Sequence, residues 1–340
     1  MRHVLKAAAL AILSLSAPAW ADECKGRNLF DTMPADKKAQ IDEAVRDVPF
    51  REGLLYRASK GDRQITLVGT YHFGDDRHAA MVQRLQPVIA DAAALYVEAG
   101  PREEARLTEA LKSDPGLMVD ADGPTLPERL SPDEWERLSQ AMSDRGSPAV
   151  ITSRLRPWYV SMMLGISPCM LDAMAQSGGK TGGLDHLLVH QAQQQEKPIH
   201  ALEPWDTIFD LYSDLSPAQE VDMIRAALPS AAHADDYAVT LTDAYFSGDV
   251  WRIWEFGRFD AYDNSGLPKS EVDAQMALAQ DRLMDSRNRK WIEVLTTGAE
   301  NAKADGKGIV AAFGALHLPG KAGVLNLLQE QGYDIQRLDG

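Results

Sequence analysis

The sequence predicts an α/β fold: a mixed central sheet built from both ends of the chain, with a largely helical inserted subdomain. Two apolar, partly β-branched runs at 65–70 and 309–313 have the pattern of buried strands. Helical spacing dominates most of the chain between them, and no low-complexity linker divides it. We therefore expect 22–340 to fold as one unit in which 105–270 forms a helical insertion or lid.

The N-terminal elements are predicted to be a hairpin and then a strand–helix–strand unit. Strand-like runs at 54–58 and 64–70 flank the turn-forming residues 59–62. Helical apolar spacing over 78–91 leads to a short apolar run at 95–98. This order implies a right-handed crossover and a parallel strand pair, so both strands should end at the same edge of the sheet.

The later elements are mainly helices. Ser131 and Ser216 each precede a proline and a side-chain acceptor three residues on, which marks the start of a helix. The remaining expected elements are a short strand at 199–203, a long helix at 271–297, a helix at 321–331 and a last strand at 334–338.

The N-terminus has the features of a secretory signal peptide. Arg2 and Lys6 precede an apolar stretch at 7–15, and Ala-Trp-Ala at 19–21 has the form of a signal-peptidase site. We expect a signal peptide at 1–21, a mature chain that starts at Asp22, and a periplasmic or secreted protein.

Composition narrows the range of partners. The net charge is −15, and loss of Arg2 and Lys6 with the signal peptide would make it −17. Nucleic acid and anionic membrane surfaces should repel such a chain. No second apolar run reaches the ~18 residues of a membrane span. We therefore expect no nucleic-acid partner and no stable membrane insertion, while the sequence does not indicate an oligomeric state.

The two cysteines, Cys24 and Cys169, are predicted to form a disulfide. An even cysteine count in an oxidising compartment favours a disulfide over free thiols. The alternative, Cys169 as a nucleophile, requires a neighbouring base that the sequence does not identify.

Both buried strands end in the pattern Gly-x-x-His, as Gly69 to His72 and Gly314 to His317. A glycine lets the backbone turn sharply, so each histidine should stand at the carboxyl edge of the sheet, where α/β proteins bind ligands. One such motif is a weak signal, but its repetition after two similar strands favours a shared site. Glu98, which ends the short third strand, should lie at the same edge.

Two imidazoles and a carboxylate are a common hydrolytic ligand set for zinc and also suit manganese or cobalt. His72, Glu98 and His317 are therefore the expected ligands of a divalent metal. Glu98 has two other interpretations, as a general base or as a buried carboxylate that pairs with an arginine.

These motifs resemble the TraB/GumN family, which is related to the Tiki metalloproteases of animals. The resemblance runs from about Cys24 to the C-terminus and implies an α/β fold and a metal-dependent hydrolase. A peptidase that acts on a peptide or small amide is the leading expectation, with both histidines and Glu98 in the active site. The similar segments are 69–75, 95–98, 183–185, 202–203, 287–288, 314–320 and 331–333.

Arg287 corresponds to the arginine of a family-like Arg-Asn pair. It is the expected catalytic cation, which would stabilise an oxyanion or hold a substrate carboxylate; the alternative is a salt bridge on the helix surface. Asp75 is expected to orient His72, and Glu203 follows another strand-like run toward the same sheet edge.

Three functions fit these features. The first is an exported metal-dependent hydrolase that resembles metalloproteases. The second is a periplasmic protein that binds haem, iron or a peptide in the same pocket without turnover. The third is an accessory factor in polysaccharide export, which the GumN name suggests but no sugar-binding feature supports.

Overall fold

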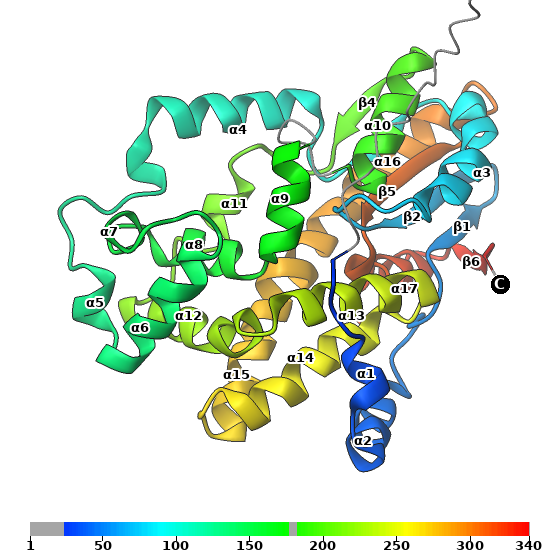
Figure 1. The fold of residues 1–340 in the computed structure, drawn as a ribbon. Helices are drawn as coiled ribbons and strands as arrows, with labels where there is room; N and C mark the ends of the chain where they lie inside the picture. The colour runs from blue at the N-terminus through cyan, green and yellow to red at the C-terminus, as the bar shows by residue number, and fades with distance from the viewer. Residues whose placement is uncertain (1–23, 177–181, 340) are drawn as a thin grey trace, which may run out of the picture.

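The computed structural model describes residues 24–176 and 182–339. The predicted signal peptide at 1–21 and the predicted mature start at Asp22 lie outside the described residues. A six-stranded mixed sheet lies at one side of the molecule, and most helices gather at the other (Figure 1). The strands are β1 (Leu55–Lys60), β2 (Arg63–Thr70), β3 (Leu95–Val97), β4 (Ile199–Ala201), β5 (Ile309–Gly314) and β6 (Asp334–Arg337).

The sheet contains strands from both ends of the chain, in the order β4-β3-β5-β2-β1-β6. β2, β5, β3 and β4 are parallel neighbours, whereas β1 runs antiparallel to both β2 and β6. This confirms the predicted α/β fold with a mixed sheet. The expected pairing of β2 with β3 was wrong, because the two strands are parallel but not adjacent. β5 lies between them, and its apolar side chains fill this central position, which is buried on both faces.

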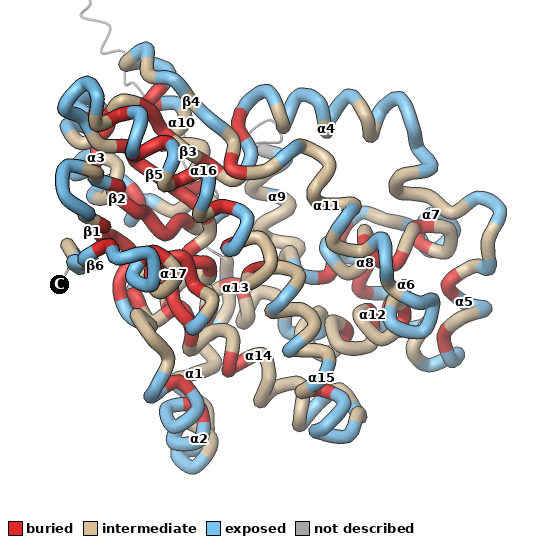
Figure 2. The backbone as a smooth tube through the Cα atoms, turned by 180° about the vertical axis from the view of Figure 1, so that it is seen from behind, coloured by how far each residue is buried: buried red, intermediate tan, exposed pale blue. Residues whose placement is uncertain are grey.

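Helices cover both faces of the sheet. Successive strand side chains point to opposite faces, so Leu67 packs with Trp291 of α16 and neighbouring Val68 packs with the helices of the other face. α3 (His78–Asp91) and α10 (Leu184–Gln194) cover that other face, and α16 (Ser286–Lys303) and α17 (Val324–Glu330) cover the first. Figure 2 shows the buried residues concentrated here, whereas α4 (Pro101–Ser113) contains none.

The remaining helices form a lobe beside the sheet, with a separate core that includes Leu138, Val160 and Ile224. Capping boxes start two of them at Ser131 and Ser216, as the sequence predicts. Not all of the segment 105–270 belongs to this lobe, since α10 packs on the sheet and β4 is one of its strands. The other helices are α1 (Leu29–Thr32), α2 (Ala35–Val45), η1 (Pro115–Leu117), α5 (Leu126–Arg129), α6 (Pro132–Ser143), α7 (Ala149–Thr152), α8 (Pro157–Leu164), α9 (Pro168–Gln176), α11 (Thr207–Asp210), α12 (Pro217–Ala231), α13 (Ala234–Ser247), α14 (Val250–Asn264) and α15 (Lys269–Gln280).

The expected long helix at 271–297 contains an irregularity. α15 passes through a π-helical segment, η2 (Asp281–Asp285), directly into α16. Such π segments widen the helix locally and often occur at functional sites. Arg287 lies two residues beyond this one.

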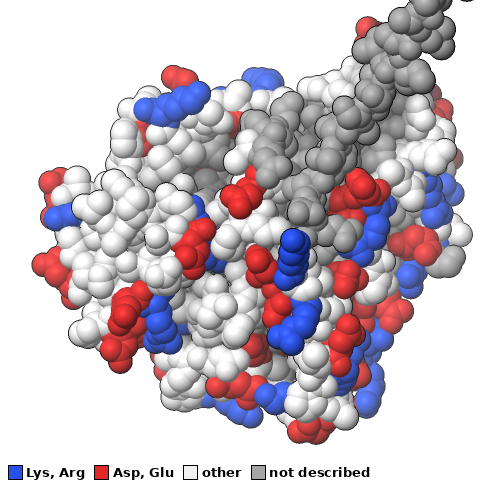
Figure 3. Space-filling model, viewed as in Figure 1, with Lys and Arg blue, Asp and Glu red and all other residues white. Residues whose placement is uncertain are grey.

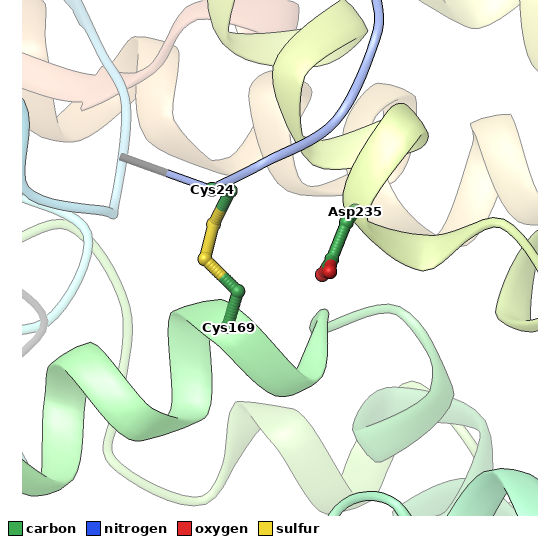
Figure 4. A group of neighbouring side chains, drawn as sticks. All are labelled: Cys24, Cys169 and Asp235. Carbon is green, nitrogen blue, oxygen red and sulfur yellow. A yellow bond between two sulfur atoms is a disulfide. The ribbon is translucent and has the colours of Figure 1, made fainter. Parts of the chain in front are cut away.

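A disulfide joins Cys24 to Cys169 of α9, with Cα atoms 5.6 Å apart (Figure 4). This confirms the predicted pairing and anchors the N-terminal segment to the helical lobe. None of the helices in the described ranges has the length and hydrophobicity needed to cross a bilayer. On the face shown in Figure 3, acidic and basic side chains are interspersed, without one broad patch of a single sign.

Candidate functional site

Three parallel strands deliver the candidate residues to one edge of the sheet. β2, β5 and β3 run in the same direction, with Thr70 paired to Gly314 and Val97 paired to Ala312. The residues that follow these strands therefore meet at their carboxyl ends, the usual ligand position in α/β proteins. His72 follows β2, Glu98 follows β3, and His317 lies in η3 (Ala315–His317) directly after β5.

The three side chains surround the α-carbon of Gly314. A Cβ at this position would lie 3.2 Å from Glu98 Oε1, 3.6 Å from His317 Cδ2 and 3.6 Å from His72 Nε2. The two ring atoms can therefore be no farther apart than twice 3.6 Å. The structure thus places His72, Glu98 and His317 around one small volume, although they are far apart in the sequence.

The glycines of the two motifs provide space, and neither adopts the positive φ that favours glycine. Gly314 has a φ of −48°, and Gly69 is not among the glycines with positive φ. A Cβ on Gly69 would lie 2.7 Å from Leu318 Cδ1 and 3.1 Å from the α-carbon of Ala315. Gly69 lets the turn after β5 pack closely against β2, and Gly314 leaves room for the polar side chains of the site.

His317 is buried and its tautomer is defined. Its Nδ1 lies 2.6 Å from Asn288 Oδ1, while Asn288 Nδ2 donates to the carbonyl of Ala322 at 2.9 Å. The amide oxygen can only accept, so Nδ1 carries the proton and the lone pair is on Nε2. Burial lowers the pKa of His317 to about 3, which keeps the ring neutral. Its Nε2 is 3.3 Å from Arg287 Nη1.

His72 is half exposed, and its Nδ1 lies 3.4 Å from Asp185 Oδ2. Asp185 reaches it because α10 starts against β2, where Leu184 N donates to Tyr71 O at 2.9 Å. Burial opposes protonation of His72, but the adjacent Asp185 carboxylate outweighs burial and raises the pKa to about 9. The Nε2 atom is left on the side of the ring that faces Gly314.

The expected role of Asp75 was wrong. Its carboxylate accepts the backbone N–H of Arg77 and two hydrogen bonds from the Arg77 guanidinium, at 2.8–2.9 Å. Because this arginine is only two residues away, it reaches Asp75 at the surface. Asp185 occupies the position beside His72 that the sequence assigned to Asp75.

Arg287 is largely buried and donates hydrogen bonds to two carboxylates. Nη2 donates to Glu98 Oε2 at 2.6 Å and to Glu203 Oε1 at 2.7 Å, and Nε donates to Glu203 Oε2 at 2.8 Å. The three side chains are only 13–19% exposed. The alternative of a surface salt bridge for Arg287 is therefore wrong, and Glu98 does pair with an arginine.

The charged neighbours of Glu98 keep its carboxyl group ionised. Burial opposes ionisation of Glu98, but its basic neighbours, His317 and Arg287 foremost, lower the pKa to about 2. The Gly314 amide also donates to Glu98 Oε1 at 2.6 Å. Burial raises the pKa of Glu203, which Arg287 partly offsets. Glu98 is therefore ionised at neutral pH, where it contacts the Arg287 guanidinium and lies beside the neutral His317 ring.

The donor set fits a divalent metal in type and orientation. Both histidines hold Nδ1 against an oxygen atom and have Nε2 on the side of the site, as metal-binding histidines commonly do. Arg287 contacts both Glu98 and His317, and the three candidate ligand atoms do not all lie within 4.8 Å of one another. Within the described ranges, only Cys24, Cys169 and Asp235 bring three ligand atoms within 4.8 Å of one another (Figure 4). Two of these are disulfide sulfurs and not thiolates.

Comparison with known proteins identifies the family of the chain. The model of the TraB/PrgY/gumN family matches residues 54–337. The chain belongs to this family. It is also 25% identical over 274 residues to the uncharacterized protein YbaP of Escherichia coli strain K12, a match that covers 79% of this chain and 89% of that protein. A YbaP protein of Shigella flexneri matches with the same identity and coverage. Family membership confirms the resemblance seen in the sequence.

Sequence reasoning missed the partners that orient the candidate ligands. Asp185 and Asn288 each hold a histidine Nδ1, and Trp291 donates from its indole nitrogen to Glu203 Oε2 at 3.2 Å. Asp185 and Asn288 lie within segments that carry the family resemblance, at 183–185 and 287–288. That position was the available signal, but it does not reveal which side chain contacts which.

Proposed function

We propose that this protein is an exported metal-dependent hydrolase that acts on a peptide or small amide. The observation that carries the proposal is the pair of imidazoles with Nδ1 held by oxygen and Nε2 on the side of Glu98 and Gly314. Two imidazoles and a carboxylate at the edge of a sheet form the type of site used for metal-assisted hydrolysis. The disulfide from Cys24 to Cys169 agrees with folding in an oxidising compartment.

Each residue has a distinct task in this proposal. His72, His317 and Glu98 would hold the ion, either zinc, manganese or cobalt. Bound metal would polarise the scissile carbonyl and lower the pKa of water toward neutrality. Asp185 and Asn288 fix the orientation of the two imidazoles. Glu98 lies where it can alternatively accept the proton of the attacking water.

Arg287 is the cation for charge that develops on the substrate. Glu203 binds the guanidinium through two atoms, which fixes its plane and leaves Nη1 on the side of His317. A fixed guanidinium of this kind can stabilise an oxyanion without reorganisation. Its two carboxylate partners keep it charged, because they raise its pKa despite burial.

A peptide-library digest tests the proposal. The mature protein should cleave peptides, lose activity on chelation and regain it with zinc, manganese or cobalt. His317→Ala should abolish cleavage, whereas replacement of the exposed His190 on α10 should not. Arg287→Ala should lower turnover by ~10²–10³ with metal still bound. Undiminished cleavage after chelation, or in His317→Ala, would contradict the proposal. Metal-dependent peptide binding without cleavage would favour a binding protein.

A further inference from the structure

Every N–H group of the Arg287 guanidinium has a partner within the protein. Nε and Nη2 donate to the carboxylates of Glu203 and Glu98, at 2.6–2.8 Å. Nη1 donates to the carbonyl of Leu283 at 2.8 Å and lies 3.3 Å from His317 Nε2. A guanidinium has five N–H groups and no acceptor. These contacts therefore use all of its donors.

The contact with His317 uses the lone pair that a metal would need. Arg287 can only donate, so Nε2 of His317 must be the acceptor. Asn288 leads to the same assignment independently, because its side-chain oxygen holds the proton on Nδ1. The unprotonated nitrogen of a neutral imidazole has a single lone pair, which either accepts a hydrogen bond or binds a metal. Arg287 and a metal ligated by His317 therefore exclude each other at Nε2.

Glu98 is engaged by the same guanidinium. Its Oε2 accepts from Arg287 Nη2 at 2.6 Å, and its Oε1 accepts from the backbone N–H of Gly314 at 2.6 Å. The positive charge of Arg287 thus lies beside two of the three proposed ligands. The side chains of Arg287 and Glu98 are only 13% and 19% exposed, so water screens this charge weakly. A divalent cation would meet electrostatic repulsion here as well as competition for the lone pair.

From these contacts we infer that Arg287 competes with the metal for His317 and thereby lowers the affinity of the site for metal. The inference rests on the proposed function and specifies how that site is regulated. When His317 Nε2 holds the metal, one N–H of Nη1 loses its partner, and an oxyanion on the substrate needs such a donor. The contacts with Glu203 and Leu283 keep the guanidinium in place.

Two variants remove the competitor. Arg287→Met introduces a side chain of similar length with no charge and no donor, but it leaves two carboxylates without their cation. The double variant Arg287→Met/Glu203→Gln removes one charge of each sign, so the net charge is that of the parent. Replacement of both partners of a buried ion pair by neutral residues often preserves stability.

Arg282→Gln is the matched control. Arg282 lies in the π-helical segment that precedes α16 and donates to the carbonyl of Leu211 at 2.8 Å. Within the described residues it forms no hydrogen bond or ion pair with the proposed metal ligands. Arg282→Gln therefore removes the same charge as Arg287→Met without removing a contact to the site.

The test is calorimetric titration of the chelated mature proteins with zinc. Arg287→Met and the double variant should each bind zinc at least about tenfold more tightly than the parent, the scale on which groups beside metal ligands change affinity. Arg282→Gln should bind zinc like the parent. Circular dichroism and thermal unfolding check that every variant is folded.

Nuclear magnetic resonance of the parent with isotope-labelled histidine tests the competition without a substitution. The His317 signals are identified by their loss in His317→Ala. Zinc should shift the Nε2 signal of His317, because its lone pair passes from a hydrogen bond to the metal, while Nδ1 keeps its proton. An unchanged Nε2 signal at saturating zinc would overturn the inference.

Zinc affinity equal to or weaker than that of the parent, in both Arg287→Met and the double variant, would also overturn the inference. Metal-dependent peptide cleavage by the parent would then still support the proposed hydrolysis. Tighter zinc binding in both variants, together with a parent that cleaves no peptide, would support the competition and contradict only the hydrolysis.

Discussion

Asn288 Oδ1 lies 2.6 Å from His317 Nδ1, in a buried contact between α16 and the turn that follows β5. The same amide also donates to the carbonyl of Ala322 at 2.9 Å, which fixes its orientation. Asn288 therefore determines which nitrogen of His317 carries the proton. Through this contact, Asn288, which follows Arg287 in the sequence, fixes the orientation of the His317 ring.

Replacement of Asn288 should separate this orienting role from simple packing. Asn288→Ala leaves His317 Nδ1 and the Ala322 carbonyl unpaired, which should cost about 1–3 kcal/mol of stability. It should also weaken zinc binding by ~10–100-fold. Asn288→Asp keeps an oxygen beside Nδ1 and should retain more zinc affinity than Asn288→Ala. Chemical denaturation and zinc titration would measure both effects; equal zinc affinity in all three proteins would contradict the role.

Gly314→Ala should disrupt the site, because it places a methyl group between the candidate ligands. The added methyl group would lie 3.2 Å from Glu98 Oε1 and 3.6 Å from a ring atom of each histidine. Overpacking of this kind typically costs about 1–3 kcal/mol, and we expect zinc affinity to fall at least ~10-fold. Gly257→Ala in α14 is the control, because its Cβ would meet nothing within 4 Å. Parent-like zinc affinity in Gly314→Ala would contradict the assigned position of the site.

Glu134 should give the helical lobe a measurable dependence on pH. Its ion pair with Arg225, at 2.7 Å, and its cap on Ser131 lower the pKa of Glu134 to about 2. A carboxyl group with a depressed folded-state pKa stabilises the protein above its unfolded pKa of about 4.5, and this contribution is lost as the pH falls toward 2. Glu134→Gln keeps the cap but removes the charge, so it should cost about 1 kcal/mol at pH 7.

The difference between parent and Glu134→Gln should shrink as the pH falls from about 4.5 to 2, as measured by denaturation at several pH values. Glu128→Gln is the matched control, since Glu128 caps Thr125 in the same way and forms no hydrogen bond with an arginine in the described structure. At pH 7, Glu128→Gln should lower the free energy of unfolding by less than Glu134→Gln does. A difference for Glu134→Gln that stays constant with pH would contradict the ion-pair explanation.

Local patterns predicted the strands that carry the site but not their neighbours. The apolar runs before His72 and His317 could be recognised because a strand that is buried on both faces needs apolar side chains at consecutive positions. The position of β5 between β2 and β3 depends on packing across the whole chain. A short sequence window does not contain that information.

The partners of the candidate residues were unpredictable for the same reason. Asp75 is close to His72 in the sequence but pairs with Arg77, while Asp185 reaches His72 through the packing of α10. Glu203 was noted only for its place after a strand-like run, and its two hydrogen bonds to Arg287 require the sheet and α16 to be assembled. Sequence thus indicated the types of site residue, and tertiary packing determined their contacts.

Zinc titration of the chelated mature protein, followed by calorimetry, tests the central claim most directly. The parent should bind one ion per chain, and His72→Ala and His317→Ala should each lose most of that affinity, because each removes one of three proposed ligands. His190→Ala should bind zinc like the parent. Parent-like zinc binding in both His72→Ala and His317→Ala, or no specific binding by the parent, would contradict a metal site at this edge of the sheet.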